Sequence, residues 1–351
     1  ERDHGLDPTQ DYSAGRAGGG QGLVGWQRRV AALGAAGVHA RQCRALLQVL
    51  VGLLCAVPAL AAPEVAATAA RTRASAPAVT ASAPRAVVSG CDAWVGRLPN
   101  VSRALCASAQ LVPSAGRSVN GAPLYTHDIN PEGAKLRVLV MGAIHGDELS
   151  SGSLALHWIR LAQQEPAMQM PQAVHWRFIP VLNPDGVMHQ PPRRVNANGV
   201  DLNRNFPTPN WERDAAVYWE KRTRKDPRRY PGKKPLSEPE SRFLHEQMQS
   251  FKPHLIVAIH APYGVLDFDG PSVPPSRLGR LYLDQVGIFP GSLGNYGGVH
   301  KGVPVVTIEL PNAMRTPLEA EMRQMWVDML RWMSSRLGAG AVGAAGAGSA
   351  R

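Results

Sequence analysis

The chain has 351 residues, of which 44% are hydrophobic, and a formal net charge of +11. Usable core sequence begins only near residue 86, which leaves roughly 250 residues, enough for one catalytic-size α/β domain. Despite the basic charge, the chain carries no nucleic-acid-binding motif, so we predict no nucleic-acid partner.

The N-terminal segment, residues 1 to 61, predicts export. Arg41 and Arg44 precede an apolar run over residues 45 to 57, and a small-residue cleavage motif ends at Ala61, which is the order found in secretory signals. The run is too short to span a bilayer comfortably, although an uncleaved anchor is the alternative. We therefore expect a periplasmic or secreted protein without a stable membrane span, and a cytoplasmic one if this segment is not a signal.

The rest of the chain divides into a linker, a catalytic domain and a tail. Residues 62 to 86 are mostly Ala, Pro, Ser and Thr and predict a disordered linker, and the Gly- and Ala-rich residues 338 to 351 predict a disordered tail. Residues 87 to 337 form the predicted catalytic domain, which holds Cys91 and Cys106. In an oxidising compartment this pair predicts a disulfide, with two buried thiols as the alternative.

Within that domain, short β-branched runs alternate with helical patterns. The runs predict strands buried on both faces, at residues 135 to 144, 174 to 182, 254 to 260 and 303 to 310. The helical patterns cover residues 148 to 164, 238 to 250 and 317 to 336. Ser237, with Glu240 three residues later, indicates a capping box at the second helix. The alternation predicts an α/β fold with a mostly parallel sheet covered by helices on both faces.

Polar side chains follow the predicted strands at their carboxyl ends, where ligands bind in open α/β sheets. His145 and Glu148 follow the first strand, His260 the third, and Glu309 lies near the end of the fourth. Either histidine alone could be structural, but two histidines and a carboxylate are the three protein ligands typical of a catalytic zinc ion. Glu309 is then the free carboxylate best placed to take a proton from water.

The segment RVNANGVDLNRNFPT, residues 194 to 208, lacks the periodicity of a helix or strand. Arg204 offers a planar guanidinium for a carboxylate, Asn203 can add a hydrogen bond, and Arg194 could face a developing oxyanion. The alternative is that Arg204 merely ties the loop to Asp201 or Asp185.

A basic segment, KRTRKDPRRYPGKK at residues 221 to 234, holds eight Lys or Arg residues and one Asp. We interpret it as a solvated loop, with attraction to an anionic polymer such as cell wall or lipid headgroups as the alternative.

The motifs HGDE, NPDG, GVDLNRNFP, SEPE, PGSLG and TIELP occur in this order between about residues 120 and 335. Together with the strand-end histidine, this set resembles the zinc carboxypeptidase superfamily, and most of all its bacterial murein peptide amidase branch. The resemblance implies a mixed, mostly parallel, twisted sheet of eight strands with helices on both faces.

The resemblance also implies a role for each candidate residue. His145, Glu148 and His260 would bind one Zn²⁺ per chain, and Glu309 would be the general base. Arg194, with neighbouring Arg193 as the alternative, would polarise the scissile carbonyl. The substrate's terminal carboxylate would be held by Asn203 and Arg204.

The reaction implied is release of meso-diaminopimelate from the γ-D-glutamyl bond of murein peptides, so the expected partner is such a peptide or another peptide with a free C-terminal carboxylate. An N-acyl amino acid amidohydrolase of the aspartoacylase or succinylglutamate desuccinylase type shares the HGxE and DLNR elements and stays the alternative. NPDG and SEPE favour the peptidase. A catalytically inactive wall-binding module would be expected to have lost Glu309 or a metal ligand, and this chain has lost neither.

Two further features bear on the pocket. Pancreatic carboxypeptidases carry a mobile tyrosine where this chain reads Val286-Gly287-Ile288-Phe289, so no tyrosine is assigned a catalytic role. Asp267 and Asp269 could meet a cationic or zwitterionic group, although acidic residues in turns are more often solvated or capping. The sequence predicts no oligomeric state.

Overall fold

The computed structural model describes residues 91–164 and 173–337, all of which lie in Thr80–Arg351, the second of the two units into which the chain divides. The signal segment, the linker and the tail lie outside these residues and stay predictions. Among the helices of the described ranges, none has the length and apolar character to cross a bilayer.

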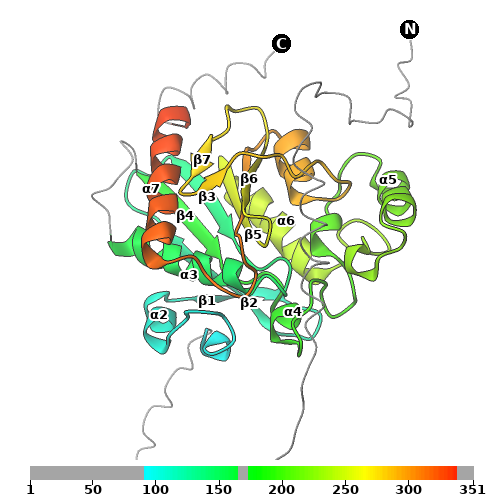
Figure 1. Ribbon diagram of the computed structural model, residues 1–351, viewed down its shortest axis with the longest axis horizontal. Coiled ribbons are helices and arrows are strands. Elements are labelled where there is room, and N and C mark those ends of the chain that lie inside the picture. Colours follow the sequence, from blue (N-terminus) through cyan, green and yellow to red (C-terminus); the bar gives the residue numbers. More distant parts are fainter. Residues whose placement is uncertain (1–90, 165–172, 338–351) are drawn as a thin grey trace, which may run out of the picture. The chain divides into compact units, whose positions relative to one another are not determined.

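One seven-stranded sheet, in the order β1-β2-β4-β3-β5-β9-β6, organises the domain (Figure 1). Its strands are β1 (Val112–Arg117), β2 (Pro123–Ile129), β3 (Leu136–Met141), β4 (Val174–Ile179), β5 (Leu255–His260), β6 (Val265–Asp269) and β9 (Val305–Glu309). The four central strands β4, β3, β5 and β9 are parallel, whereas β1, β2 and β6 pair antiparallel at the edges. The expected mixed α/β sheet with a parallel centre is therefore confirmed.

The expected count of eight strands is wrong for the described residues. β7 (Arg277–Leu278) and β8 (Leu281–Tyr282) form a separate two-stranded sheet, which touches the main one through a single bridge from Leu283 to Leu266. The segment that leads into β7 contains Pro271, Pro274 and Pro275. Proline has no N–H for a strand ladder, so this segment cannot extend the sheet.

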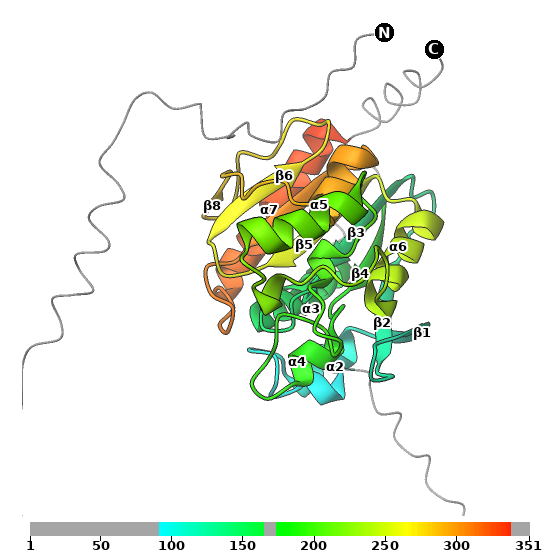
Figure 2. The same cartoon turned by 90° about the vertical axis from the view of Figure 1, so that its right-hand side faces the viewer.

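Helices cover both faces of the sheet, as expected. They are α2 (Arg103–Ser108), α3 (Leu149–Gln164), α4 (Pro184–Met188), α5 (Trp211–Val217), α6 (Pro239–Phe251) and α7 (Glu319–Arg336). Short 3₁₀ or π turns are η1 (Asp92–Trp94), η2 (Leu202–Arg204), η3 (Tyr218–Arg222), η4 (Pro227–Arg229) and η5 (Gly294–His300). Figure 1 shows α3 and α7 on one side of the sheet and α6 on the other, the side that faces the viewer in Figure 2.

Alternation along the strands builds a separate core on each face. Val138 and Val140 of β3 pack in the cluster that holds Trp158 of α3 and Trp326 of α7. Leu139 and Met141 of the same strand join the other cluster, with Phe243 of α6. Burial on both faces explains why β3 is apolar at every position except Arg137.

The capping box predicted at α6 is wrong. Glu238, not Ser237, is the N-cap residue, and its side chain makes no capping hydrogen bond. Ser237 Oγ instead donates to Glu238 Oε1, at 2.6 Å. The Glu240 carboxylate accepts from the backbone N–H of Val119 and from Asn196 Nδ2, so it makes tertiary contacts rather than reaching back to Ser237.

The expected disulfide between Cys91 and Cys106 is confirmed. Both residues are fully buried, and their Cα atoms lie 5.4 Å apart. The bond ties the first described turn to α2 across a sequence separation of 15, a constraint worth on the order of 3 kcal/mol in the chain-entropy model.

Candidate metal centre

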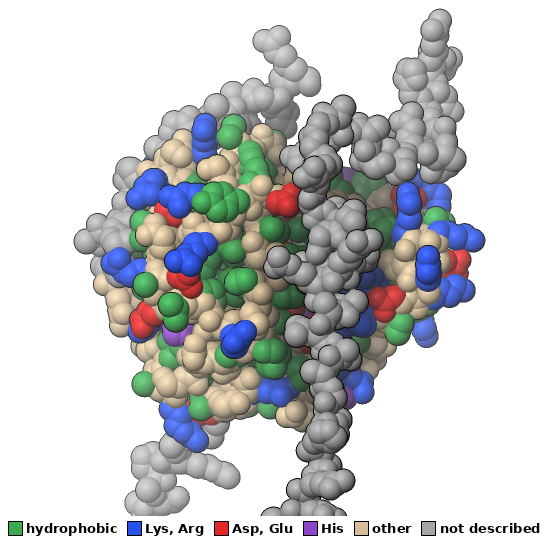
Figure 3. All heavy atoms as spheres, in the orientation of Figure 1, with side chains coloured by type: hydrophobic (Ala, Val, Ile, Leu, Met, Phe, Trp, Pro, Cys, Tyr) green, Lys and Arg blue, Asp and Glu red, His purple; other side chains and the backbone are tan. Residues whose placement is uncertain are grey.

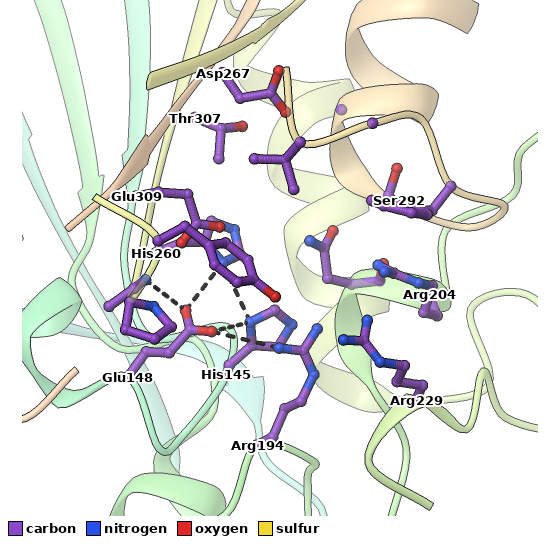
Figure 4. A pocket seen from close by; sticks show the side chains of 18 of the residues that line it. His145, Glu148, Arg194, Arg204, Arg229, His260, Asp267, Ser292, Thr307 and Glu309 are labelled. Carbon is purple, nitrogen blue, oxygen red and sulfur yellow. Dashed lines mark hydrogen bonds and ion pairs between the residues drawn. The ribbon is translucent and has the colours of Figure 1, made fainter. Parts of the chain in front are cut away.

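The three predicted metal ligands converge at the carboxyl edge of the parallel strands (Figure 4). His145 lies in the turn after β3, Glu148 lies just before α3, and His260 is the last residue of β5. Glu148 Oε1 lies 2.7 Å from His145 Nδ1, and Glu148 Oε2 lies 3.1 Å from His260 Nδ1. The two Nδ1 atoms are 3.2 Å apart, so all three donors face one point.

These donors fit a zinc ion. Each of the three residues is at most 5% exposed, and two imidazole nitrogens with one carboxylate leave one tetrahedral position open. Burial alone would raise the pKa of Glu148, but His145 and His260 together lower it well below its usual range. The carboxylate is therefore ionised, as a metal ligand must be.

The loops that carry these ligands are tied together by the NPDG motif. Asn183 caps α4 by accepting from the N–H of Gly186, and its Nδ2 donates to the carbonyl of Arg194. Gly146, the glycine of HGDE, packs so closely on the backbone of Gly186 that a Cβ there would overlap it. The glycine thus permits the close approach of the two loops.

Asp201 is a site residue that the sequence analysis missed. Its Oδ1 lies 3.1 Å from His145 Nε2, and its Oδ2 accepts from Arg194 Nε at 3.0 Å. A carboxylate on the outer nitrogen of a metal-ligating histidine fixes the ring's tautomer and orientation. The signal was present in the DLNR motif, where Asp201 had been considered only as a partner for Arg204.

Arg194 lies between the two carboxylates of this cluster. Its Nη2 is 3.0 Å from Asp201 Oδ2, and its Nη1 is 3.5 Å from Glu148 Oε1. Its side chain borders the pocket, whereas neighbouring Arg193, the alternative, is not one of the pocket-lining residues within the described ranges.

Asn203 and Arg204 belong to η2 and line the pocket, and Figure 4 shows Arg204 on the opposite wall from the metal ligands. Asn203 Oδ1 accepts from the N–H of Leu293, which leaves the amide N–H groups as its remaining donors. Arg204 stacks over the Phe289 ring, with its guanidinium carbon 4.4 Å from the centroid. The residue is 4% exposed, and its Nε has no partner among the described residues.

The alternative that Arg204 ties the loop to Asp201 or Asp185 is wrong. Asp201 pairs with His145 and Arg194, and Asp185 accepts from Ser118 Oγ. The side chain of Arg204 makes only one hydrogen bond within the described part of the chain, from Nη1 to the carbonyl oxygen of Asn203. Its remaining donors are available to a ligand.

Glu309 is the last residue of β9 and lies directly opposite His260 of β5 in the strand register. The backbone of Tyr263 donates a hydrogen bond to its carboxylate, but Oε2 is buried with no partner among the described residues. Burial, assisted by the nearby charge of Glu148, raises the pKa of Glu309. A carboxylate with a raised pKa and a free oxygen is suited to accept a proton.

The three metal donors line one pocket of about 880 Å³ together with Arg194, Asn203, Arg204 and Glu309. Tyr218 and Tyr263 also line it, whereas Tyr282 and Tyr296, which flank residues 286 to 289 in the sequence, do not belong to its lining within the described ranges. Sequence reasoning overlooked Tyr263 although it follows His260 by three positions.

The basic segment lies beside this pocket. Arg222, Arg228 and Arg229 line its mouth, and Arg228 Nη1 lies 2.8 Å from Oδ2 of Asp147 in the HGDE turn. Figure 3 shows Lys and Arg side chains gathered at the edge formed by α5 and the turns that follow it. The segment is therefore placed where it can contact a ligand of the pocket, rather than on a remote surface.

Comparisons with known proteins bear on the family of this chain. The family model described as zinc carboxypeptidase matches residues 104–267. Murein peptide amidase A of Vibrio campbellii is 33% identical over 216 residues, which cover 60% of this chain and 81% of that protein. Murein peptide amidase A of Escherichia coli K12 is 30% identical over 227 residues, which cover 62% and 88%.

A solved structure supports the fold. Carboxypeptidase A from Helicoverpa armigera superposes with a TM-score of 0.50 over 64% of this chain and 68% of that chain, at 17% identity. At that identity the likeness concerns the fold alone.

Proposed function

Because the chain belongs to the zinc carboxypeptidase family and is a metallopeptidase hydrolase of that kind, we propose that it hydrolyses the γ-D-glutamyl bond to meso-diaminopimelate in murein peptides. The observation that carries the proposal is the meeting, in one pocket, of three metal donors, a free carboxylate oxygen and a buried guanidinium. Relatives named murein peptide amidase, at 30% and 33% identity, support this substrate class.

We assign the metal to His145, Glu148 and His260. Zinc supplies Lewis-acid chemistry when it is bound, polarising a carbonyl and lowering the pKa of water. Asp201 holds the His145 ring in the orientation that presents Nδ1, and Arg194 holds Asp201. Arg194 also points Nη1 toward Glu148, one of the assigned metal ligands. We therefore place its guanidinium beside the carbonyl oxygen of the substrate, which gains negative charge as the amide is attacked.

The remaining roles follow from the free polar atoms. Glu309 takes the proton of the attacking water at Oε2 and can return it to the leaving nitrogen. Arg204 and the amide of Asn203 hold the α-carboxylate of the leaving residue, because a guanidinium pairs with a carboxylate through two parallel hydrogen bonds. This contact restricts cleavage to the residue at the end of a peptide.

We propose that the catalytic domain spans residues 87 to 337 and works in the periplasm or outside the cell, after a signal is removed near Ala61. Murein is the insoluble source of such peptides in that compartment. The arginines at the pocket mouth support an anionic substrate, since murein peptides carry several free carboxylates.

The test is mass spectrometry of the products formed when mature, zinc-loaded protein is incubated with a tripeptide that ends in γ-D-glutamyl-meso-diaminopimelate. We expect free meso-diaminopimelate, formed at least ~10-fold faster than the enzyme cleaves N-acetyl-aspartate or succinyl-glutamate. Glu309→Gln protein purified in parallel controls for contaminating peptidases. Faster cleavage of either acyl amino acid would favour the amidohydrolase alternative instead.

A further inference from the structure

The basic segment brings a second loosely paired guanidinium to the pocket. Arg229, in η4, lines the pocket, and its side chain is only 32% exposed. Its one ion pair, from Nε to Oδ2 of Asp226, is 3.6 Å long, and no hydrogen bond within the described ranges reaches its Nη atoms. Figure 4 shows the guanidinium pointing into the pocket on the same wall as Arg204. Its two terminal nitrogens are therefore available to a ligand.

The turn that carries Arg229 is held against the metal centre. The side chain of Asp226 caps η4, and its backbone carbonyl accepts from Trp219 Nε1 at 2.8 Å. The Trp219 ring packs against Tyr230, with the ring centroids 4.9 Å apart, and the carbonyl of Tyr230 accepts from the N–H of Asp201 at 2.8 Å. The backbone of Arg229 is thus fixed one residue away from a direct contact with the loop that supports the metal ligands.

One substrate carboxylate cannot neutralise this wall of the pocket. Arg194 is already paired with Asp201, whereas Arg204 forms no ion pair within the described ranges and the pair of Arg229 is too long for a hydrogen bond. Burial lowers the pKa of Arg204, and the positive charges of Arg194 and Arg229 lower it further. Because the charges of Arg204 and Arg229 repel each other, the two residues favour a ligand with two anionic groups.

The turn η4 also borders the proposed metal ligands. Arg228 Nη1 lies 2.8 Å from Oδ2 of Asp147, the residue before Glu148 in the HGDE turn. In the proposed function the scissile carbonyl lies at the metal and the leaving residue lies at Arg204. The acyl residue, which carries the carbonyl, then extends past the HGDE turn, where its own side groups come within reach of Arg229.

We propose that Arg229 binds a free carboxylate on the acyl residue of the substrate. The inference rests on the proposed function and deepens it. A γ-linked glutamyl residue keeps its α-carboxylate four bonds from the scissile carbonyl carbon, and an extended chain of four bonds of about 1.5 Å spans about 5 Å. This carboxylate can therefore meet Arg229 while Arg204 holds that of the leaving residue. A peptide in which the acyl carboxylate is an amide should be a poor substrate.

The test compares L-alanyl-γ-D-glutamyl-meso-diaminopimelate with the same peptide carrying an α-carboxamide on the glutamyl residue, on the full chain loaded with zinc. We expect the wild-type kcat/KM to favour the carboxylate by ~10- to 100-fold, as for a hydrogen bond between charged groups. In Arg229→Gln the ratio should fall toward 1, because variant and substrate change delete one interaction. Lys221→Gln, which removes an exposed positive charge from the same segment, should keep the wild-type ratio.

A third substrate, amidated at the side-chain carboxylate of meso-diaminopimelate, shows which carboxylate Arg229 holds. We expect Arg229→Gln and the wild type to respond equally to this change, because the group belongs to the leaving residue. If the variant loses its response to this amidation and keeps its preference for the acyl carboxylate, Arg229 serves the leaving residue and the proposal is overturned.

A further pair separates this subsite from the proposed γ-glutamyl specificity. N-acetyl-α-glutamyl-meso-diaminopimelate and its glutaminyl counterpart differ by the same charge, at the same number of bonds from the scissile carbonyl. If only this pair is cleaved, and Arg229→Gln abolishes a preference for the glutamyl peptide, the proposed function fails and the subsite stands. A wild-type ratio near 1 in every cleaved pair, or a ratio that Arg229→Gln retains, overturns the subsite. No cleavage of either pair overturns both proposals.

Discussion

Two groups of charged side chains at the site differ in their partners. The paired group, whose members contact one another, is His145, Glu148, Arg194 and Asp201. The unpaired group, whose members keep a polar atom free among the described residues, is Arg204, Glu309 and Asp269. Because a buried polar atom without a partner destabilises a fold, the unpaired group marks where a ligand completes the structure.

This difference predicts two kinds of variant. Substitutions in the unpaired group should lower activity while leaving the stability unchanged or higher, since they remove an uncompensated charge. Substitutions in the paired group should lower both, because each leaves a buried charge without its partner.

The largest effect is expected for Glu309→Gln. The amide keeps the size of the side chain but cannot accept a proton, so kcat/KM should fall at least ~10²-fold. Zinc content, measured by elemental analysis, and the melting temperature should match or exceed those of the wild type, since Glu309 belongs to the unpaired group. Near-normal turnover in this variant would give the role of base to another residue.

Arg204→Ala is expected to lower kcat/KM for free-carboxylate substrates by roughly 10²-fold, since losing one partner of a buried charge pair costs about 2 to 5 kcal/mol. Amidation of the substrate terminus should cost the wild type a similar factor and the variant little more, because both changes delete the same contact. The measurement is the full cycle of two proteins and two substrates. Fully additive losses would show that Arg204 does not hold the carboxylate.

Asp201→Asn tests the paired group. Loss of a carboxylate behind a ligating histidine typically costs 10- to 100-fold in metal affinity or activity, and the buried Arg194 would also lose its counter-charge. We therefore expect weaker zinc binding in competition with a chelator, together with a lower melting temperature. Asp128→Asn is the matched control, because Asp128 also pairs with an arginine and a histidine but at an exposed site. Equal effects in the two variants would contradict the special role of Asp201.

The sequence predicts the centre of this fold better than its edges. Runs such as LRVLVM of β3 and LIVAIH of β5 are apolar at all positions but one because both faces are covered. The edge strands escaped prediction, since β2 reads PLYTHDI with an exposed aspartate and β6 reads VLDFD with two buried aspartates. Those aspartates break the apolar pattern because they face a pocket rather than the core.

The prediction of the site from the sequence has the same limit. The proposed ligands and Glu309 could be predicted because each ends a recognisable strand or motif. The partner of Arg194 could not, since Asp201 approaches His145 from a position 56 residues later along an irregular loop. Only the folded chain shows which charges are neutralised by neighbours and which are left for a ligand.

The smallest expected effect is on stability, and it depends on pH. The pKa of Asp269 is raised in the fold from 3.8 to about 7, so between these values the folded state binds a proton more tightly than the unfolded chain does. The stability that this group contributes is therefore lost as pH rises through that window. Asp269→Asn removes the loss, and its melting temperature should exceed that of the wild type by more at pH 8 than at pH 5.5. Part of the charge is screened by solvent. We therefore expect the difference in melting temperature between the variant and the wild type to grow by about 2 to 4 °C from pH 5.5 to pH 8, equivalent to about 1 kcal/mol in a domain of this size. The measurement is thermal unfolding with saturating zinc, and Glu246→Gln, which removes an exposed negative charge on α6, should show no such change with pH. An advantage that stays constant or shrinks would mean that Asp269 has a partner in the free protein and belongs with the paired group.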